Sequence, residues 1–264
     1  MSKSRQFEMC PKLPSPVTAL AFDLEHGHVI PEHAHPEDQL VYASQGVMTV
    51  RTGEGIWVVP PQRTVWIPAR TPHSLQMSGA VSMRTVYLRS RMAKNLPRTC
   101  CVVNVSPLLQ QLIIHLCGHK ELSRRSRSHR RLIDLLIDLL DAVHAVPLQL
   151  PNPSDTRAAR VAAALQNDPE ASLDEACQRA GGSKRTIERL FRQETKLSLG
   201  KWRQQLRLMR SLQLLAAGEK IGYAALEAGY GTPSAFIAMF RKALGTTPRR
   251  YFQSTPDAQS ATNR

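Results

Sequence analysis

The last third of the chain repeats one pattern of apolar and polar positions after about fifty residues. Small, turn-forming and aromatic residues return in the same order in the second copy. The first set is Ala176, Ala180-Gly181, Ser183, Phe191-Arg192, Ser198 and Trp202, and the second is Ala224, Ala228-Gly229, Thr232, Phe240-Arg241, Thr247 and Tyr251. Each copy is typical of a short helix, a glycine-bearing turn and a second helix. We therefore expect two helix-turn-helix units, over about residues 173–193 and 221–244.

The first copy contains start and stop signals for both of its helices. Ser172 stands at a capping position, and Glu175 three residues later suits a capping box. Gly181 ends this helix, because glycine readily adopts the left-handed conformation found at helix ends. Ser183 then caps a second helix over about residues 184–193. By helical spacing, the outward face of that helix carries Lys184, Arg185, Glu188, Arg189 and Arg192.

This mainly basic face has the chemistry of a recognition helix. Arginine can donate two hydrogen bonds to guanine or bind a phosphate, and glutamate can accept a hydrogen bond from cytosine. A charged helical face is more often simply solvated. Here the caps, the repeat and the charge occur together, so we predict that double-stranded DNA is a partner.

The second copy predicts a helix that begins after Thr232, with Pro233 at its first position. Phe236, Ile237 and Phe240 form its apolar side. Its outward positions are small at the start and basic at the end, namely Ser234, Ala235, Ala238, Arg241 and Lys242. We expect this helix and its cap to contribute phosphate anchoring and apolar or water-mediated contacts more than strong base discrimination.

One long helix is expected to join the two units. Ser198 starts it, and apolar residues recur at helical spacing until Gly218 ends it. These residues are Trp202, Leu206, Met209, Leu212 and Leu215. If both units enter one face of B-DNA, the joining helix should hold them about 34 Å apart, which is one turn of the duplex.

Residues 228–236 (AGYGTPSAF), 240–242 (FRK) and 245–248 (GTTP), followed by Tyr251, resemble the signature of AraC-type transcription regulators. The resemblance covers about residues 154–253. It implies that bases are read by Arg185, Glu188 and Arg189 in the first unit and by Pro233, Ser234 and Ala238 in the second. The chain departs from the pattern at Lys196, where relatives often have glycine, and at Phe252, where they often have arginine. Relatives often carry a longer polar residue at the Ala238 position, so sequence preference should depend mainly on the first unit.

The N-terminal part has a different pattern, with short segments rich in Val, Ile, Tyr and Trp. They are residues 39–43, 47–52, 56–60, 64–67, 73–77 and 83–88. Turn-forming stretches such as Ser44-Gln45-Gly46 and Ser78-Gly79 separate them, which predicts a sandwich or small barrel. In residue type and spacing, the chain is similar to the two cupin motifs at Gly27, His33-Ala34-His35, Gln39, Gly46, Pro68 and His73.

In metal-binding cupins two histidines and a glutamate of the first motif meet a histidine of the second. The resemblance therefore implies a set made of His33, His35, Gln39 and His73. Three neutral imidazoles with an open position suit zinc or another divalent metal, but the amide of Gln39 removes a charged ligand. We expect no resident cofactor, and a divalent metal on His33, His35 and His73 stays open as the alternative.

A pocket for a small-molecule effector is the expected use of this barrel. The histidines and Gln39 would contact the effector, and three aromatic residues are candidates to line the pocket, although aromatic residues on strands are more often core. These are Tyr42, Trp57 and Trp66.

Two helices should follow the barrel, one from Ser106-Pro107 to about residue 116 and one over residues 130–146. The second has an apolar stripe that would pack on the barrel or pair with its copy in a homodimer, made of Leu132, Leu136, Leu139, Leu140 and Val143. The basic run over residues 124–131 is expected to be a solvated loop.

These elements predict the domain organisation of the chain. Residues 1–100 form the barrel, 101–146 the connecting or dimerisation helices, and 154–253 the DNA-binding domain. Residues 147–153 (PLQLPNP) are expected to be a stiff linker, and residues 254–264 a disordered tail.

Composition agrees with a nucleic-acid partner. The net charge is +14 and the pI about 10.1, and residues 154–264 hold 18 Lys and Arg against 10 Asp and Glu. Residues 1–16 contain no apolar signal region, and the apolar stretch over residues 132–146 is interrupted by three aspartates, so we expect no membrane partner and a cytoplasmic location. Five cysteines, two of them adjacent, do not suggest a disulfide framework.

The expected fold class is α+β with two domains, an N-terminal cupin-like β-barrel with trailing helices and a C-terminal all-α double helix-turn-helix. The expected function is a sequence-specific transcription regulator, activator or repressor, modulated by a small-molecule ligand in the barrel, with RNA polymerase as a further partner. One alternative is a metal-dependent cupin enzyme fused to a helical DNA-targeting domain. Gln39 and the lack of another acid–base constellation in residues 1–90 count against it. A second alternative is an architectural DNA-binding protein without an effector.

Overall fold

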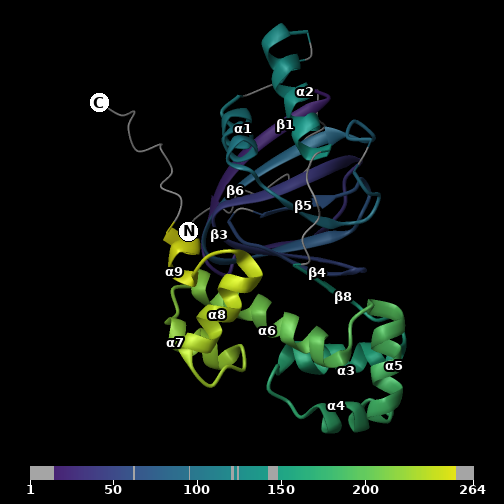
Figure 1. Cartoon of the computed structure of the whole chain (residues 1–264). Coiled ribbons are helices and arrows are strands. Elements are labelled where there is room, and N and C mark those ends of the chain that lie inside the picture. The colour runs from purple at the N-terminus through teal and green to yellow at the C-terminus, as the bar shows by residue number, and fades with distance from the viewer. Residues whose placement is uncertain are drawn as a thin grey trace, which may run out of the picture.

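The chain folds into a sheet-rich N-terminal part and a helical C-terminal part (Figure 1). A computed structural model describes residues 15–61, 63–94, 96–119, 122–123, 125–141 and 148–253. Two helices, α1 and α2, lie on one side of the strands, and the C-terminal helices lie on the opposite side. The expected two-domain α+β fold is confirmed.

Eight strands form one antiparallel sheet that curves into a barrel. They are β1 (Val17–Leu24), β2 (Val29–His33), β3 (Glu37–Thr52), β4 (Gly55–Val59), β5 (Arg63–Ile67), β6 (His73–Arg89), β7 (Cys101–Asn104) and β8 (Gln149–Pro151). The long strands β3 and β6 pair along most of their length, and β1, β2, β4 and β5 pair with one or other of them.

Two turns expected from the sequence are instead irregularities within long strands. The stretch around Gly46 is a β-bulge in β3, where the register with β6 shifts twice. Gly46 has φ +75°, and a side chain there would meet the carbonyl oxygen of Ala80 at 2.3 Å, so the close approach of the two strands requires glycine. Gly79 has φ +74° and lies within β6. Turn-forming residues therefore bend these strands without ending them.

Successive side chains along a strand point to opposite faces of the sheet, and this divides the buried apolar residues of the barrel into two clusters. Val41, Val50 and Leu75 belong to a cluster inside the barrel, whereas Leu40 and Val86 belong to a second cluster on the outer face of the sheet. Directly paired residues share a face, as Val50 and Leu75 do. The outer cluster is covered by α1 (Pro107–Cys117) and α2 (Arg127–Asp141).

The helices after the barrel pack on it through their apolar stripes. Ile133, Leu136 and Leu140 of α2 are buried in the outer cluster, and Val143 lies outside the described residues. The basic run is only partly a loop, because α2 already begins at Arg127. The hydroxyl of Ser126 accepts from the amide of His129, as a helix-capping serine does, and this starts the helix earlier than expected.

The segment expected to be a stiff linker contains a strand. Gln149–Pro151 forms β8, which pairs with β4 and extends the sheet. Extended backbone near prolines is compatible with both a linker and an edge strand of a sheet. In the folded chain this segment pairs with β4 and becomes an edge strand.

Seven helices of the described residues form the C-terminal part. They are α3 (Thr156–Asn167), α4 (Leu173–Arg179), α5 (Lys184–Thr195), α6 (Leu199–Ala216), α7 (Ile221–Glu227), α8 (Pro233–Leu244) and α9 (Pro248–Gln253). Helices α4 and α5 form one helix-turn-helix and α7 and α8 the other, and α6 joins them (Figure 1). The hydroxyls of Ser172, Ser183, Ser198 and Thr232 cap their helices as expected.

Helix α6 also carries the contact between the two parts of the chain. The indole nitrogen of Trp202 donates to the carbonyl oxygen of Pro151 at 2.8 Å, and the amide of Gln213 donates to the hydroxyl of Thr49 at 2.7 Å. The apolar cluster inside the barrel continues without a break into the helical part, where it includes Trp202 and Leu206. The two parts are therefore joined by a packed interface as well as by the chain.

Candidate functional site

Helix α5 presents a basic face to solvent. Its cap is formed by Ser183, whose hydroxyl accepts from the amide of Thr186 at 3.3 Å. Ile187, Leu190 and Phe191 are buried, so helical spacing turns the other side outward. The exposed residues on that side are Lys184, Arg185, Arg189 and Arg192. Arg185, Arg189 and Arg192 lie along a shallow concave surface whose lining also includes Thr186, Glu188 and Gln193.

Local partners hold several of these side chains in place. Arg189 donates to the amide oxygen of Gln193 at 3.2 Å, and the half-buried Glu188 lies 3.9 Å from Arg192. Lys184 lies 3.2 Å from Asp174 on α4. Exposed pairs of this kind contribute little free energy, about 1 kcal/mol or less, so a phosphate or a base edge can replace them.

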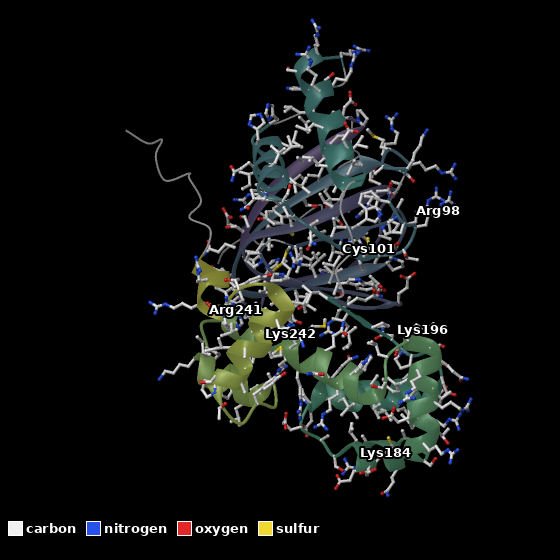
Figure 2. The ribbon with its side chains drawn as sticks, in the orientation of Figure 1. Arg98, Cys101, Lys184, Lys196, Arg241 and Lys242 are labelled. Carbon is white, nitrogen blue, oxygen red and sulfur yellow. The ribbon has the colours of Figure 1, made fainter. Side chains whose placement is uncertain are left out.

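Helix α8 presents the second candidate surface at the other end of α6 (Figure 2). The hydroxyl of Thr232 accepts from the amide of Ala235 at 3.2 Å, and Gly245 ends the helix with φ +81°. Its exposed outward residues are Ser234, Ala238, Arg241 and Lys242. The small residues lie at the start of the helix and the two cations in its last turn, as the sequence predicts.

Aromatic contacts attach α5 and α8 to the rest of the helical part. Phe191 of α5 packs edge-on against Trp202 of α6, with ring centroids 5.4 Å apart. Phe240 of α8 packs against Tyr251 of α9 at 5.6 Å, and Tyr251 is fully buried. These contacts hold α5 against α6 and α8 against α9.

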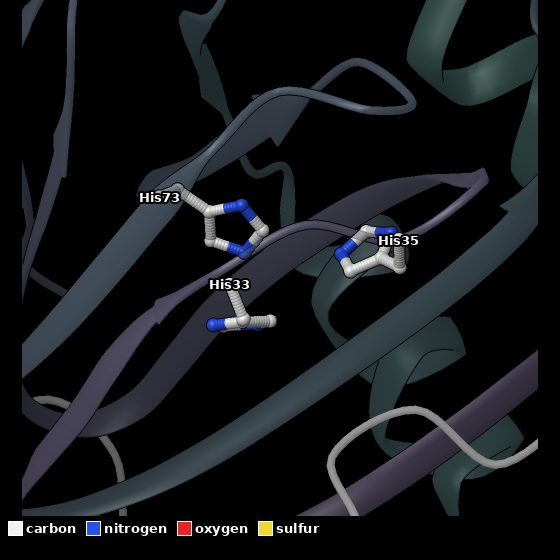
Figure 3. A group of neighbouring side chains, drawn as sticks. All are labelled: His33, His35 and His73. Carbon is white, nitrogen blue, oxygen red and sulfur yellow. The ribbon is translucent and has the colours of Figure 1, made fainter.

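Three histidines meet inside the barrel (Figure 3). His33 ends β2, His35 follows it, and His73 begins β6 directly opposite His33 in the strand pairing. The ring centroids of His33 and His73 are 4.3 Å apart, and those of His35 and His73 are 5.2 Å apart. One ring nitrogen from each of the three lies within 4.8 Å of the others.

Each imidazole is oriented by a backbone carbonyl two residues away in sequence. The Nδ1 atoms of His33, His35 and His73 lie 2.9, 2.8 and 2.8 Å from the carbonyl oxygens of Pro31, Glu37 and Thr71. A carbonyl oxygen can only accept, so each Nδ1 carries a hydrogen, and in a neutral ring the Nε2 of His33 or His73 keeps its lone pair. The Nε2 atoms of His33 and His73 are buried without a hydrogen-bond partner.

Burial keeps His73 neutral. Its side chain is fully buried, and this desolvation lowers the pKa of His73 from 6.5 to about 4. The hydrogen bond to Thr71 opposes the shift, and the neighbouring His33 and His35 add to it.

Gln39 joins the cluster from β3. Its Oε1 lies 3.1 Å from His35 Nε2, and its Nε2 donates to the hydroxyls of Thr85 at 2.9 Å and Tyr87 at 3.1 Å. Thr85 and Tyr87 were not identified from the sequence. Their positions follow from the pairing of β3 with β6, which places Tyr87 opposite Gln39. A β-strand pairing of this length cannot be read from one sequence.

The aromatic candidates are divided between the two faces of the sheet. Trp57 pairs with Val50 and lies in the inner cluster with Leu75, on the histidine side. Tyr42 and Trp66 belong instead to the outer cluster beneath α1 and α2, and the indole of Trp66 donates to the carbonyl oxygen of Pro97. The alternation of side chains along β3 and β5 sends them away from the barrel interior.

The residues at the cluster suit a divalent metal with nitrogen ligands. Three converging imidazoles, each held by a carbonyl, are the arrangement in which histidine binds such ions. Two of their buried nitrogens have no other partner. Of the residues that the structure describes, this is the only group of three such side chains close enough to hold an ion.

A double helix-turn-helix with a basic first reading helix, joined to a barrel with a buried polar cluster, defines the class of ligand-responsive DNA-binding regulators. Comparison with known families agrees, because residues 155–254 match a helix-turn-helix domain and residues 16–151 match the AraC-like ligand binding domain. The chain belongs to the AraC family of transcription regulators.

Individual proteins are similar to this chain over different shares of their length. The chain is 35% identical over 235 residues to the HTH-type transcriptional regulator NimR of Escherichia coli, covering 88% of this chain and 86% of that protein. It is 30% identical over 82 residues to the transcriptional activator RhaR of Klebsiella pneumoniae, covering 31% of this chain and 29% of the relative. The crystal structure of ToxT from Vibrio cholerae is 10% identical, with a TM-score of 0.37 over 89% of this chain and 94% of that one.

No helix in the described parts of the chain is both long enough and apolar enough to cross a membrane.

Proposed function

We propose that α5 reads bases and that α8 anchors the phosphate backbone when this regulator binds its operator. The observation that carries the proposal is the exposed arginine face of α5, behind a capped helix start. The proposed contacts of the first unit are Ser183, Lys184, Arg185, Glu188, Arg189 and Arg192. Those of the second are Thr232, Ser234, Ala238, Arg241 and Lys242.

The aromatic packing of both helices against their neighbours supports this division of roles. Helix α6 holds the two units at a fixed separation, as reading successive turns of one duplex face requires. Because Ser234 and Ala238 carry short side chains, α8 can approach the backbone closely but offers few groups for direct base recognition.

The barrel is proposed to bind the effector through the residues on its inner face. His33, His35, Gln39 and His73 supply the polar contacts, and Trp57 lies on the same face. The effector would act on DNA binding through the packed contact of α6 with the barrel, as a coupling free energy between two sites.

We further propose that the protein acts as a homodimer in the cytoplasm and that it contacts RNA polymerase. The apolar stripe of α2 is already used against the barrel, so a dimer would use other apolar side chains. Leu108 of α1 and Leu135 of α2 are 56% and 38% exposed, which supports a partner on this side of the barrel. The family assignment also favours a regulator over the alternative of a metal-dependent enzyme.

The test compares Arg189→Ala with Arg241→Ala in the full-length protein. Both residues are exposed cations, one on each reading helix. Loss of a bidentate base contact at Arg189 should cost about 1–3 kcal/mol at the preferred site and relax discrimination at one or two base pairs. Loss of a phosphate contact at Arg241 should weaken all sequences alike.

The measurement is binding to a site selected from genomic fragments and to a library randomised around it. Unchanged base preference and affinity in Arg189→Ala would show that the reading face is assigned wrongly. Relaxed discrimination in Arg241→Ala would instead reverse the proposed roles of the two helices.

A further inference from the structure

An arginine in the middle of α6 touches the entry of one helix-turn-helix unit and the turn of the other. Nε of Arg207 donates to the carbonyl oxygen of Pro169 at 3.2 Å, and its Nη2 lies 2.6 Å from a carboxylate oxygen of Glu170. Both acceptors belong to the loop over residues 168–172, which ends at Ser172, the cap of α4. Arg207 therefore holds the start of the first unit against α6.

The same guanidinium lies against the turn of the second unit. Gly229 stands between α7 and α8 with φ +76°, and a side chain there would meet Nη1 of Arg207 at 2.1 Å. The side chain of Arg207 is only 19% exposed, and a charge that is mostly removed from water depends on its partners. The three nitrogens of one planar group thus face both units.

We propose that Arg207 is a positioning residue that fixes the angle between the two helix-turn-helix units, and that it thereby sets the spacing of the two duplex segments that this regulator accepts. The inference rests on the proposed contact of α5 and α8 with one duplex. Helix α6 sets the distance between the units, but a helix alone does not stop a unit from turning about its connection. A planar fork bonded to one unit and packed on the other opposes that rotation.

The spacing of the two DNA segments is a sensitive measure of this angle, because the duplex is helical. One inserted base pair rotates the far segment by about 34° and moves it by about 3.4 Å along the axis. Two units held at a fixed angle lose contacts when the far segment moves in this way. Units that turn freely follow the segment and keep their contacts.

The experiment measures the affinity of the full-length protein for its selected operator and for the same duplex with one base pair inserted between the two protected segments. The parent protein should bind the inserted duplex at least about tenfold more weakly, which is the loss of one hydrogen bond to a charged group. In Arg207→Ala this ratio should fall to about threefold or less, while binding to the uninserted operator weakens, because more freedom is lost on binding.

Matched variants separate this role from a general loss of charge or stability. Arg210→Ala removes an exposed cation from α6 and should keep the ratio of the parent protein. Gly229→Ala and Gly181→Ala add the same side chain at equivalent turns, with φ +76° and +78°. A side chain at Gly181 meets no atom within 4 Å, whereas one at Gly229 displaces Arg207. Gly229→Ala should therefore lower the ratio, and Gly181→Ala should leave it unchanged.

The outcomes distinguish this inference from the proposed function. Thermal unfolding shows whether each variant is folded, and if Arg207→Ala does not fold, the two glycine variants decide. The full ratio of the parent protein in folded Arg207→Ala, or in Gly229→Ala, overturns the inference and leaves the roles of α5 and α8 intact. A parent protein that binds both duplexes equally overturns the inference together with the proposed contact of α8.

Discussion

Burial shifts the pKa values of several ionisable side chains in this protein, those of the cysteines as well as that of His73. Desolvation raises the pKa of Cys100 from 9.0 to about 12 and that of Cys101 to about 11, and the pKa of Cys117 also rises to about 11. Nearby Glu54 and Cys101 add to the shift at Cys100. The thiolate is the reactive form, so these thiols are protected by the fold.

The cysteine pKa values predict slow alkylation and a loss of stability at high pH. Since the thiols hold their protons more tightly in the folded state, their contribution to stability is complete below the unfolded pKa of about 9 and decreases as pH rises through it. At pH 8, iodoacetamide should label Cys100 and Cys101 slowly in the folded protein and rapidly after unfolding in urea, as followed by peptide mass spectrometry. Fast labelling of Cys101 in the folded protein would contradict this account.

At the scale of single elements, side-chain caps define where α4 and α5 begin. The hydroxyls of Ser172 and Ser183 accept from the amides three residues later at 3.4 and 3.3 Å, one at the start of α4 and one at the start of α5. Two nearly equivalent caps within one helix-turn-helix unit allow a matched comparison. Only the second lies next to the proposed base-reading residues.

Replacing Ser183 by alanine should affect both stability and DNA binding. Loss of the cap should lower the free energy of unfolding by about 1 kcal/mol and loosen the first turn of α5, which contains Lys184 and Arg185. Ser172→Ala should cost a similar free energy with a smaller effect on DNA affinity. Chemical denaturation and operator titration measure the two quantities. Equal losses of affinity in both variants would mean that the start of α5 does not contact DNA.

At the scale of the whole molecule, the contact between α6 and the barrel links the two parts of the chain. A side chain at Gly79 would meet the carbonyl oxygen of Ala216 at the end of α6 at 2.0 Å. Backbone cannot move aside as a flexible side chain can, so the two parts fit together only with glycine there. The amide of Gly79 is also bonded to His26, on the loop before β2 that leads to His33.

Gly79→Ala should therefore separate α6 from the barrel. Gly27→Ala is the matched control, because Gly27 has a similar φ of +79° but no atom within 4 Å of an added side chain. The control should suffer only left-handed backbone strain, roughly 1–2 kcal/mol. Gly79→Ala should in addition increase proteolysis between β8 and α3. The same proteolysis rate in both variants would show that this contact does not hold the two parts together.

The sequence by itself determined the helical part and the exposed basic face of α5. The signals there are local, since a capping serine, a glycine and a three- or four-residue spacing act within one or two turns of helix. Such signals placed Ser183, Arg189 and Thr232 where the structure has them. The spacing of the histidines likewise indicated His33, His35 and His73 as a group, and the structure brings them together.

Only the tertiary structure decided which residues share a face of the barrel. It also decided the structure of the segments that the sequence predicts to be turns and a linker. Strand pairing joins residues far apart in sequence, so one sequence could not reveal that Thr85 and Tyr87 orient Gln39, or that Tyr42 and Trp66 face away from the histidines. The same non-local pairing turned two expected turns into bulges and the expected linker into β8. Local chemistry therefore specified the helices, and long-range pairing specified which residues surround the histidine cluster.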